Sequence, residues 1–176
     1  MKYRVLSKQT NTKDCFVCGI HNDAGIKAEF FVCENQDKEK VLITRVQPRD
    51  IHQSYPDRMH GGVIASLLDE AIGRAAQIID PNVWAVTIDL NVKYRKAVPL
   101  SKTIYIETKI TNLGTRAFEG EGKVFVQGEN SVFTTATARY FRVPYDAVVP
   151  ADVPKDEAFF IVPGELPEYI TIANPL

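Results

Sequence analysis

Residues 59–77, MHGGVIASLLDEAIGRAAQ, form the stretch that decides the fold. Apolar residues recur in it at the spacing of one helix face, and Asp80-Pro81 ends the run, so the pattern predicts a helix from about Gly61 to Ile79. The apolar face comprises Ile64, Leu67, Leu68, Ala71, Ile72, Ala75 and Ile79. The opposite face comprises Ser66, Asp69, Glu70, Gly73 and Gln77. The missing side chain of Gly73 would let a backbone or a ligand approach that second face.

Segments with the composition of β-strands lie on both sides of this helix. Residues 28–34 and 40–48 predict a hairpin before it, and residues 83–94, 102–113, 117–128 and 131–143 predict a four-strand meander after it. The turns at 112–114 and 128–130 suit hairpins, so we expect a largely antiparallel sheet. This order predicts an α+β fold in which a curved sheet wraps around one long central helix.

The segment 83–94 alternates between apolar and polar residues, which predicts a strand with two distinct faces. One face is expected to carry Trp84, Val86, Ile88, Leu90, Val92 and Tyr94, and the other Thr87, Asp89, Asn91 and Lys93. In this register Thr87 lies opposite the apolar row. Thr87 can therefore take part in a functional site only if a β-bulge or a partner subunit places that site on the polar face of the strand.

Composition excludes several classes of protein. The 176 residues, 45% hydrophobic and 24% charged, are enough for one buried core. A formal net charge of −1 gives no broad positive field, so we expect no nucleic-acid partner. No apolar run approaches the roughly 20 residues that span a bilayer, and residues 1–15 lack the apolar centre of a secretory signal. We therefore expect a cytoplasmic protein without a membrane partner, with an N-terminal arm (1–25), a central domain (26–143) and a proline-rich C-terminal tail (144–176).

Two motifs together resemble a known family. HGGVIASLLDEAIG (60–73) opens the predicted helix, and VTIDLNVKYRKAVP (86–99) lies in the strand that follows. They resemble the hotdog-fold acyl-CoA thioesterases, especially the phenylacetate-pathway and small human thioesterase-like branch, over roughly residues 15–143. The resemblance implies a hotdog fold, acyl-CoA as the substrate, and no metal or cofactor.

The helix start and one carboxylate are the expected catalytic groups. Backbone N–H groups in the first turn lack intrahelical acceptors, so Gly61 and Gly62 can present donors to a carbonyl oxygen. The resemblance places the catalytic carboxylate nine residues after His60, which is Asp69 and not Glu70, acting as general base or nucleophile. It makes the Gly61 amide the main oxyanion donor. The structural alternative is a glycine turn into a helix with a solvated acidic edge.

Three further residues complete the predicted catalytic set. The resemblance places a small hydroxyl residue, here Thr87, near the nucleophilic water. It also calls for an amide six residues before His60, where this chain has Ser54; we expect Gln53 to take that role, with His52 as the alternative. His60 itself is expected to hold the loop or contact the thioester end of the substrate.

A basic cluster is the candidate site for the phosphates of coenzyme A. The segment KYRKAVPLSK (93–102) contains Lys93, Arg95, Lys96 and Lys102, and such side chains can pair with the pyrophosphate and the 3′-phosphate. The alternative is a charged rim that limits strand pairing. Gly62 and Gly73 are the other residues expected to approach the substrate.

The cysteines allow a metal or a structural interpretation. CFVCG (15–19), His21 and Cys33 form the spacing C-x2-C-x2-H-x11-C, which is not a strong zinc pattern. A CFVCG segment is also common ahead of this hotdog domain without a metal. We predict that Cys15, Cys18 and Cys33 are reduced structural thiols and that no metal is bound.

The sequence thus predicts an acyl-CoA thioesterase that releases free acid and CoA. The alternative is a non-catalytic acyl-CoA sensor on the same fold, against which the presence of Asp69 argues. A hotdog dehydratase is a third option, but no histidine pairs with the acid at that family's spacing. Because one helix and one sheet would leave an edge strand uncovered, we expect a homodimer or homotetramer with the site between subunits.

Overall fold

The computed structural model describes residues 1–154 and 158–173. Its strands are β1 (Lys2–Lys8), β2 (Glu29–Glu34), β3 (Lys40–Val46), β4 (Trp84–Tyr94), β5 (Ile104–Leu113), β6 (Ala117–Val126), β7 (Val132–Val143) and β8 (Tyr169–Thr171). The helix α1 spans Gly61–Ala75, and short 3₁₀ turns cover Asp50–His52, Ala76–Ile78 and Tyr145–Ala147. None of the helices in these ranges is long and apolar enough to cross a membrane.

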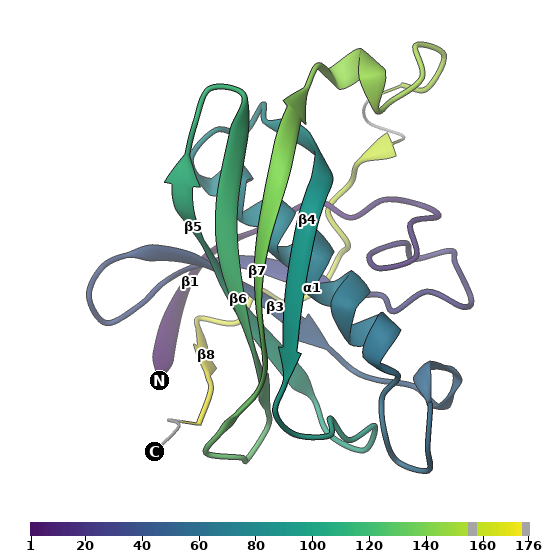
Figure 1. Ribbon diagram of the computed structural model, residues 1–176, viewed down its shortest axis with the longest axis vertical. Coiled ribbons are helices and arrows are strands. Elements are labelled where there is room, and N and C mark those ends of the chain that lie inside the picture. The colour runs from purple at the N-terminus through teal and green to yellow at the C-terminus, as the bar shows by residue number, and fades with distance from the viewer. Residues whose placement is uncertain (155–157, 174–176) are drawn as a thin grey trace.

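The strands form one curved antiparallel sheet in the order β4-β7-β6-β5-β3-β2-β1-β8, and α1 crosses one of its faces (Figure 1). This confirms the predicted α+β hotdog architecture. The predicted four-strand meander is confirmed only for β5, β6 and β7, which pair in chain order. The strand β4 pairs with β7 at the sheet edge, and β5 pairs with β3. Turn residues identify hairpins between consecutive strands, but they carry no information on where the chain re-enters the sheet after crossing it as a helix.

The apolar face of α1 packs against the concave side of the sheet. Its buried residues are Ile64, Leu67, Leu68, Ala71, Ile72 and Ala75. The helix approaches β6 closely because glycines of that strand lie directly beneath the helix. A Cβ on Gly120 would lie 2.6 Å from Ile72 Cγ2. Ile79 was expected on the buried face but is 57% exposed, because the α-helix ends at Ala75 and a 3₁₀ turn changes the direction of the last side chains.

The edge strand β4 contains a bulge that changes which residues face the helix. Its register to β7 shifts between Thr87 and Asp89, so Ile88 is the extra residue. Ala85 before the bulge and Leu90 after it both pack against the core. The predicted unbroken alternation is therefore wrong, because an extra residue reverses the inward and outward parity of a strand. Ile88 is consequently 53% exposed, and Thr87 turns toward the helix.

Both ends of the chain contribute to the sheet. In the expected N-terminal arm, β1 pairs with β2. In the expected tail, β8 pairs with β1, and Asn11 bridges to Phe160. The Asn11 side chain also donates hydrogen bonds to the carbonyls of Cys18 and Ala28, which holds the loop 9–28 in place. The division into arm, domain and tail stays a prediction, and residues 155–157 and 174–176 of the tail lie outside the described residues.

Candidate active site

A cavity of about 300 Å³ lies along the polar face of α1. The helix supplies Asp69, Glu70, Gly73, Arg74 and Gln77 to its wall. The first half of β4 supplies Val83, Trp84, Ala85 and Thr87, and the loop after β1 supplies Thr10, Thr12 and Cys15. Phe118, Tyr140 and Phe159 complete the lining. The helix face that the sequence predicted to be polar therefore faces a cavity.

Asp69 is held by two hydroxyl groups. Thr87 Oγ1 donates to Asp69 Oδ1 at 2.8 Å. The Tyr140 hydroxyl donates to the backbone carbonyl of Asp69 at 2.7 Å and lies 3.2 Å from the same Oδ1. Within residues 1–154 and 158–173 no hydrogen bond reaches Oδ2. One carboxylate oxygen is thus oriented by the protein, and the other is available to a reactant.

Tyr140 lines the same cavity, and no sequence pattern predicted it there. Its ring stacks on Phe118 with centroids 5.0 Å apart, which places the hydroxyl beneath Asp69. Burial, followed by the nearby Asp69 carboxylate, raises the pKa of this phenol, so it remains a proton donor. Gly73 makes room for it: a Cβ there would lie 3.2 Å from Tyr140 Cε1. The space predicted beside Gly73 is thus bordered by a side chain. Strand alternation alone gives Tyr140 no signal that separates it from a core tyrosine.

The start of α1 presents a different set of groups. His60 is the N-cap, and its Nδ1 accepts the Gly62 N–H at 2.9 Å. The Gly62 N–H is therefore occupied by His60. The Gly61 N–H, in the first turn of the helix, has no intrahelical carbonyl to donate to. The Tyr94 hydroxyl donates to the Gly61 carbonyl at 2.7 Å. Gly61 lines a hollow of about 290 Å³ with Met59, Ile64, Tyr94, Arg95, Lys96, Ala97 and Val98.

The two predicted catalytic groups are far apart within one chain. Asp69 follows Gly61 by eight residues in the same helix. At about 1.5 Å of rise per residue, the two positions are about 12 Å apart along the axis. Gly61 and Asp69 also line different hollows. A single thioester carbonyl cannot contact both groups of one chain.

The remaining predicted residues lie near the helix start and on the outer sheet face. Gln53 forms a bridge to Met59, and its Oε1 accepts the Asp57 N–H at 3.3 Å. The Lys96 ammonium donates to Ser131 Oγ at 3.0 Å. None of these side chains enters the cavity of Asp69.

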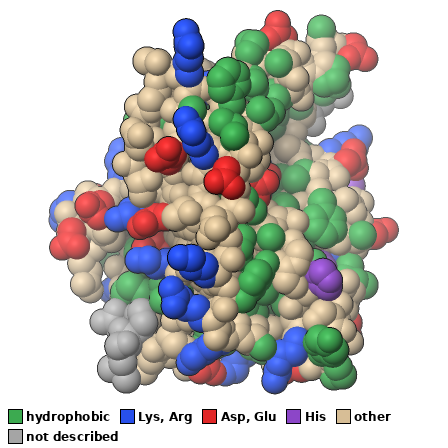
Figure 2. Space-filling model, viewed as in Figure 1, with side chains coloured by type: hydrophobic (Ala, Val, Ile, Leu, Met, Phe, Trp, Pro, Cys, Tyr) green, Lys and Arg blue, Asp and Glu red, His purple; other side chains and the backbone are tan. Residues whose placement is uncertain are grey.

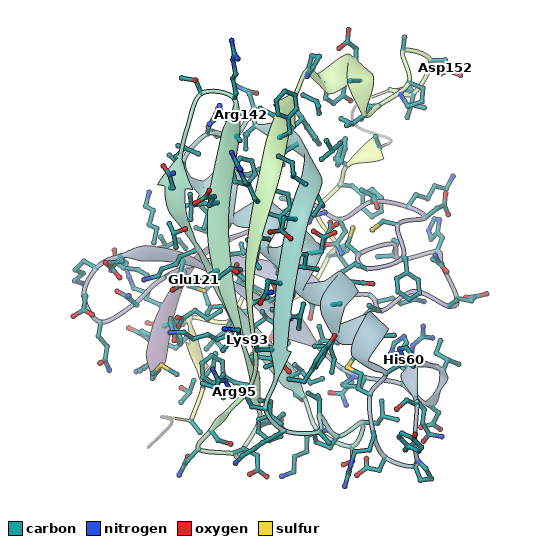
Figure 3. All side chains as sticks on the ribbon, viewed as in Figure 1. His60, Lys93, Arg95, Glu121, Arg142 and Asp152 are labelled. Carbon is teal, nitrogen blue, oxygen red and sulfur yellow. The ribbon has the colours of Figure 1, made fainter. Side chains whose placement is uncertain are left out.

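Lys93 and Arg95 lie on the sheet face away from α1. They line a shallow hollow of about 200 Å³ that also includes Glu121 and Lys123. Figure 3 shows Lys93, Arg95 and Glu121 together on this face, and Figure 2 shows basic side chains gathered on its lower part. Arg95 also borders the hollow of Gly61, so it connects the two. Lys102 is separate from this group, because it forms a 2.6 Å ion pair with Glu129.

The four residues of the weak zinc pattern do not come together. Cys33 is buried in a second apolar cluster with Tyr3 and Phe31, where burial raises the pKa of its thiol to about 12. Cys15 and Cys18 instead lie beside Glu70 of α1, and His21 is exposed. The pattern fails because Cys33 points to the other side of the sheet from the CFVCG turn.

Comparisons with known proteins agree with the motifs. A family model of the thioesterase superfamily matches residues 57–133. The acyl-coenzyme A thioesterase THEM4 of Mus musculus is 29% identical over 121 residues, which cover 69% of this chain and 51% of that protein. The chain spans about half the length of the curated relatives it matches.

Solved structures show the same fold. The PaaI protein of the E. coli phenylacetic acid degradation operon covers 69% of this chain and 86% of its own, with a TM-score of 0.58 and 14% identity. The structure of smu.793 from Streptococcus mutans, bound to acetyl CoA, covers 59% and 82%, with a TM-score of 0.54 and 24% identity. These structures confirm the hotdog fold, and the family model together with the THEM4 similarity confirms the resemblance to the thioesterase superfamily.

Proposed function

We propose that this protein hydrolyses acyl-CoA thioesters with Asp69 as the catalytic carboxylate. The observation that carries the proposal is the arrangement at Asp69: Thr87 and Tyr140 orient one carboxylate oxygen beside a cavity of about 300 Å³, while the other oxygen accepts no hydrogen bond from the described residues. A purely structural helix-edge aspartate needs neither partner. THEM4 and the acetyl-CoA complex of smu.793 support acyl-CoA as the substrate class.

In the proposed reaction, water adds to the thioester carbonyl and CoA leaves as the thiol. Asp69 Oδ2 either takes the proton from this water or itself attacks the carbonyl; in the second route CoA leaves first and water then hydrolyses the acyl-Asp69 anhydride. The Thr87 hydroxyl donates to Asp69, so its own lone pairs can accept a hydrogen bond from the water. The Gly61 N–H stabilises the oxyanion, and loss of such a donor typically costs about 10²–10³ in turnover.

The separation along α1 supports a site that two copies of the chain share. Because Gly61 and Asp69 lie about 12 Å apart along one helix, we infer that Asp69 of one copy acts with Gly61 of another. The edge strand β4 pairs only with β7 among the described strands, and its Val86 and Ile88 are 46% and 53% exposed. Antiparallel pairing of two β4 edges gives a symmetric homodimer and satisfies the open backbone edge, with these exposed side chains beside the seam. Two such dimers can form a tetramer.

The basic residues fit the phosphate end of the substrate. Arg95 and Lys96 border the same hollow as Gly61. The pantetheine arm separates the thioester of an acyl-CoA from its phosphates, so a substrate whose thioester carbonyl meets the Gly61 amide can extend its phosphates past this hollow toward the cations. Lys93 extends this set onto the outer sheet face. His60 keeps the helix start in shape through its bond to Gly62, and Gln53 lies in the adjoining loop, where its amide can orient the water.

The test is release of free CoA thiol from short, medium, long and aryl acyl-CoAs. We expect hydrolysis by the wild type and a loss of about 10²-fold or more in Asp69→Asn, with binding retained in calorimetry. Asp37→Asn, in the exposed turn between β2 and β3, is the matched control and should be fully active. If the wild type binds acyl-CoA and hydrolyses none of the panel, the sensor alternative replaces this proposal.

A further inference from the structure

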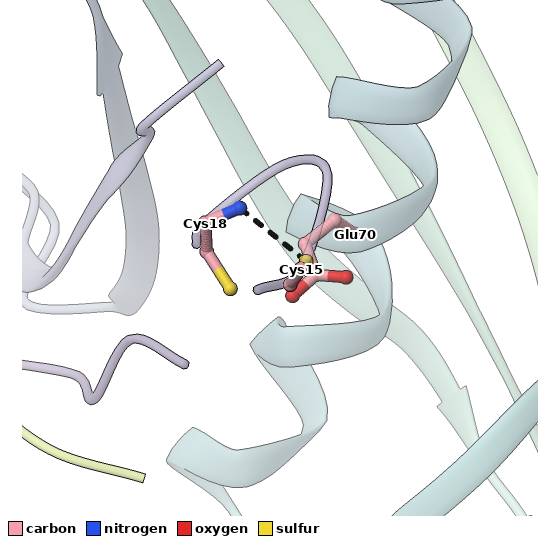
Figure 4. A group of neighbouring side chains, drawn as sticks. All are labelled: Cys15, Cys18 and Glu70. Carbon is pink, nitrogen blue, oxygen red and sulfur yellow. Dashed lines mark hydrogen bonds between the residues drawn. The ribbon is translucent and has the colours of Figure 1, made fainter. Parts of the chain in front are cut away.

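The CFVCG segment forms a single helical turn around a thiol. The Gly19 N–H donates to the Cys15 carbonyl at 2.8 Å and closes the turn. Only glycine fits at its end, because a Cβ on Gly19 would lie 2.3 Å from that carbonyl oxygen. The N–H group of Val17 points at Cys15 Sγ at 3.3 Å. The N–H group of Cys18 points at the same sulfur at 3.4 Å (Figure 4). The turn thus presents two backbone donors to the first cysteine.

A charged pair on α1 lies against the two thiols. The sulfur atoms of Cys15 and Cys18 and a carboxylate oxygen of Glu70 all lie within 4.8 Å of one another. The largely buried Arg74 donates to Glu70 at 2.6 Å and to Cys18 Sγ at 3.2 Å. Thr12 Oγ1 lies 3.3 Å from the same sulfur. Both thiols therefore have polar partners, although a structural thiol in an apolar core needs none.

We propose that Cys15 and Cys18 are a redox-active dithiol that exchanges with small-molecule disulfides, with Cys15 as the attacking sulfur. Cys15 lines the open cavity beside Glu70 and is partly exposed, whereas Cys18 is completely buried behind it. An accessible nucleophile with a protected second thiol in a C-x-x-C turn is the arrangement that such exchange requires.

The electrostatics of the pair support this division of roles. The hydrogen bond from the Cys18 thiol, together with the Val17 and Cys18 amides, lowers the pKa of Cys15 to about 6, although burial and the Glu70 carboxylate oppose the shift. The same hydrogen bond and burial raise the pKa of Cys18, against the effect of Arg74. These opposite directions agree with Cys15 as the attacking thiolate and Cys18 as the second thiol.

The exchange balances in two steps. The Cys15 thiolate attacks one sulfur of the small disulfide, a mixed disulfide forms, and the other half leaves as a thiolate with the electron pair of the broken bond. The Cys18 thiol then gives its proton to the first leaving thiolate and attacks the Cys15 sulfur. The second half leaves as a thiolate and takes from water the proton that Cys15 had released on ionising. The protein loses two hydrogens and the small disulfide is reduced to two thiols.

A divalent metal at the same cluster is disfavoured by Arg74. The candidate ligands are Cys15, Cys18 and Glu70. The Arg74 guanidinium already donates hydrogen bonds to Glu70 and to Cys18 Sγ. A zinc ion there would sit beside a buried positive charge and would displace its hydrogen bonds. A zinc ion bound at this cluster is the alternative that the test must distinguish from a redox-active dithiol.

The test uses the reduced 176-residue chain with oxidised glutathione as the probe. It needs no acyl-CoA, so it is independent of the proposed hydrolysis. Intact mass should show loss of two hydrogens, and peptide mapping should find a Cys15–Cys18 disulfide. Cys18→Ser should stop at a glutathione adduct on Cys15. At pH 7 Cys15 should react about 10-fold or more faster than Cys33. Cys33→Ser is the matched control and should leave the exchange unchanged.

Two results would overturn the proposal. One is a peptide map of the wild type in which oxidised glutathione forms no disulfide between Cys15 and Cys18. This result would contradict the proposal even if the Cys18→Ser variant did not fold. The other is one equivalent of zinc in the purified protein, with both thiols reacting only after chelation. In that case the cluster is a metal site.

Discussion

Thr87 Oγ1 donates a hydrogen bond to Asp69 Oδ1 at 2.8 Å, which connects the edge strand β4 to the polar face of α1. The contact exists because the bulge at Ile88 lets Thr87 and Leu90 face the helix together. Without the extra residue, one of the two would point outward. The bulge thus places a hydroxyl at the carboxylate while the apolar packing of the strand is kept.

Replacement of Thr87 by valine removes this hydroxyl with little change of shape. The hydrogen bond is to a charged group and is worth about 1.5–3 kcal/mol, so kcat for acyl-CoA hydrolysis should fall about 10-fold or more. Thr87→Ser keeps the hydroxyl and should recover most of the rate. Steady-state kinetics with the best thioester of the panel would check this. An unchanged kcat in Thr87→Val would remove Thr87 from the site.

Ile88, at the bulge of β4, is the position from which to test the two-copy site. A lysine there should oppose pairing of two β4 edges, so Ile88→Lys should move the protein toward the monomer in sedimentation velocity. Hydrolysis should fall with the dimer fraction, because Asp69 then lacks the Gly61 amide of a second copy. Ile161→Lys, in an equally exposed part of the tail, should change neither property. A fully active monomer would contradict the shared site.

Gly120 tests the close packing between α1 and β6. A Cβ at this position would lie 2.6 Å from Ile72 Cγ2 and 3.0 Å from the Lys109 carbonyl oxygen. Gly120→Ala should therefore lower the free energy of unfolding by about 1–3 kcal/mol, the usual cost of overpacking. Urea denaturation would measure it. Lys123→Ala, on the exposed face of the same strand, should stay within about 0.5 kcal/mol of the wild type.

The ion pairs of Glu29 predict a dependence of stability on pH. Burial opposes ionisation of Glu29, but hydrogen bonds from Lys8 and Arg45 outweigh it and lower the pKa of the carboxyl. A lowered pKa in the folded state stabilises the protein above the unfolded pKa of about 4.3, and this contribution is lost as pH falls through the folded value. Glu29→Gln should flatten the fall in Tm below about pH 5 relative to the wild type. If the Tm of Glu29→Gln and the Tm of the wild type fell by the same amount between neutral and acidic pH, this prediction would be contradicted.

Local pattern was enough to predict the helix and most strands. Six apolar residues of α1 are buried where their spacing placed them, because the side-chain period of a helix reports directly which face meets the core. The helix start, with His60 as the N-cap, is likewise a local property of the chain. The predicted roles of Gly61, Asp69 and Thr87 came from motif spacing and remain proposals.

Tertiary packing decided the rest. The sequence could not place β4 beside β7, show the bulge at Ile88, or bring Tyr140 under Asp69, because each depends on segments that are distant in the chain. The same holds for the contact of CFVCG with Arg74 on α1. Periodicity records whether a residue is buried, but not which residue covers it. The sequence by itself therefore determined the helix, its buried face and most of the strands, and only the three-dimensional packing decided the faces of β4 and which polar groups meet in the cavity.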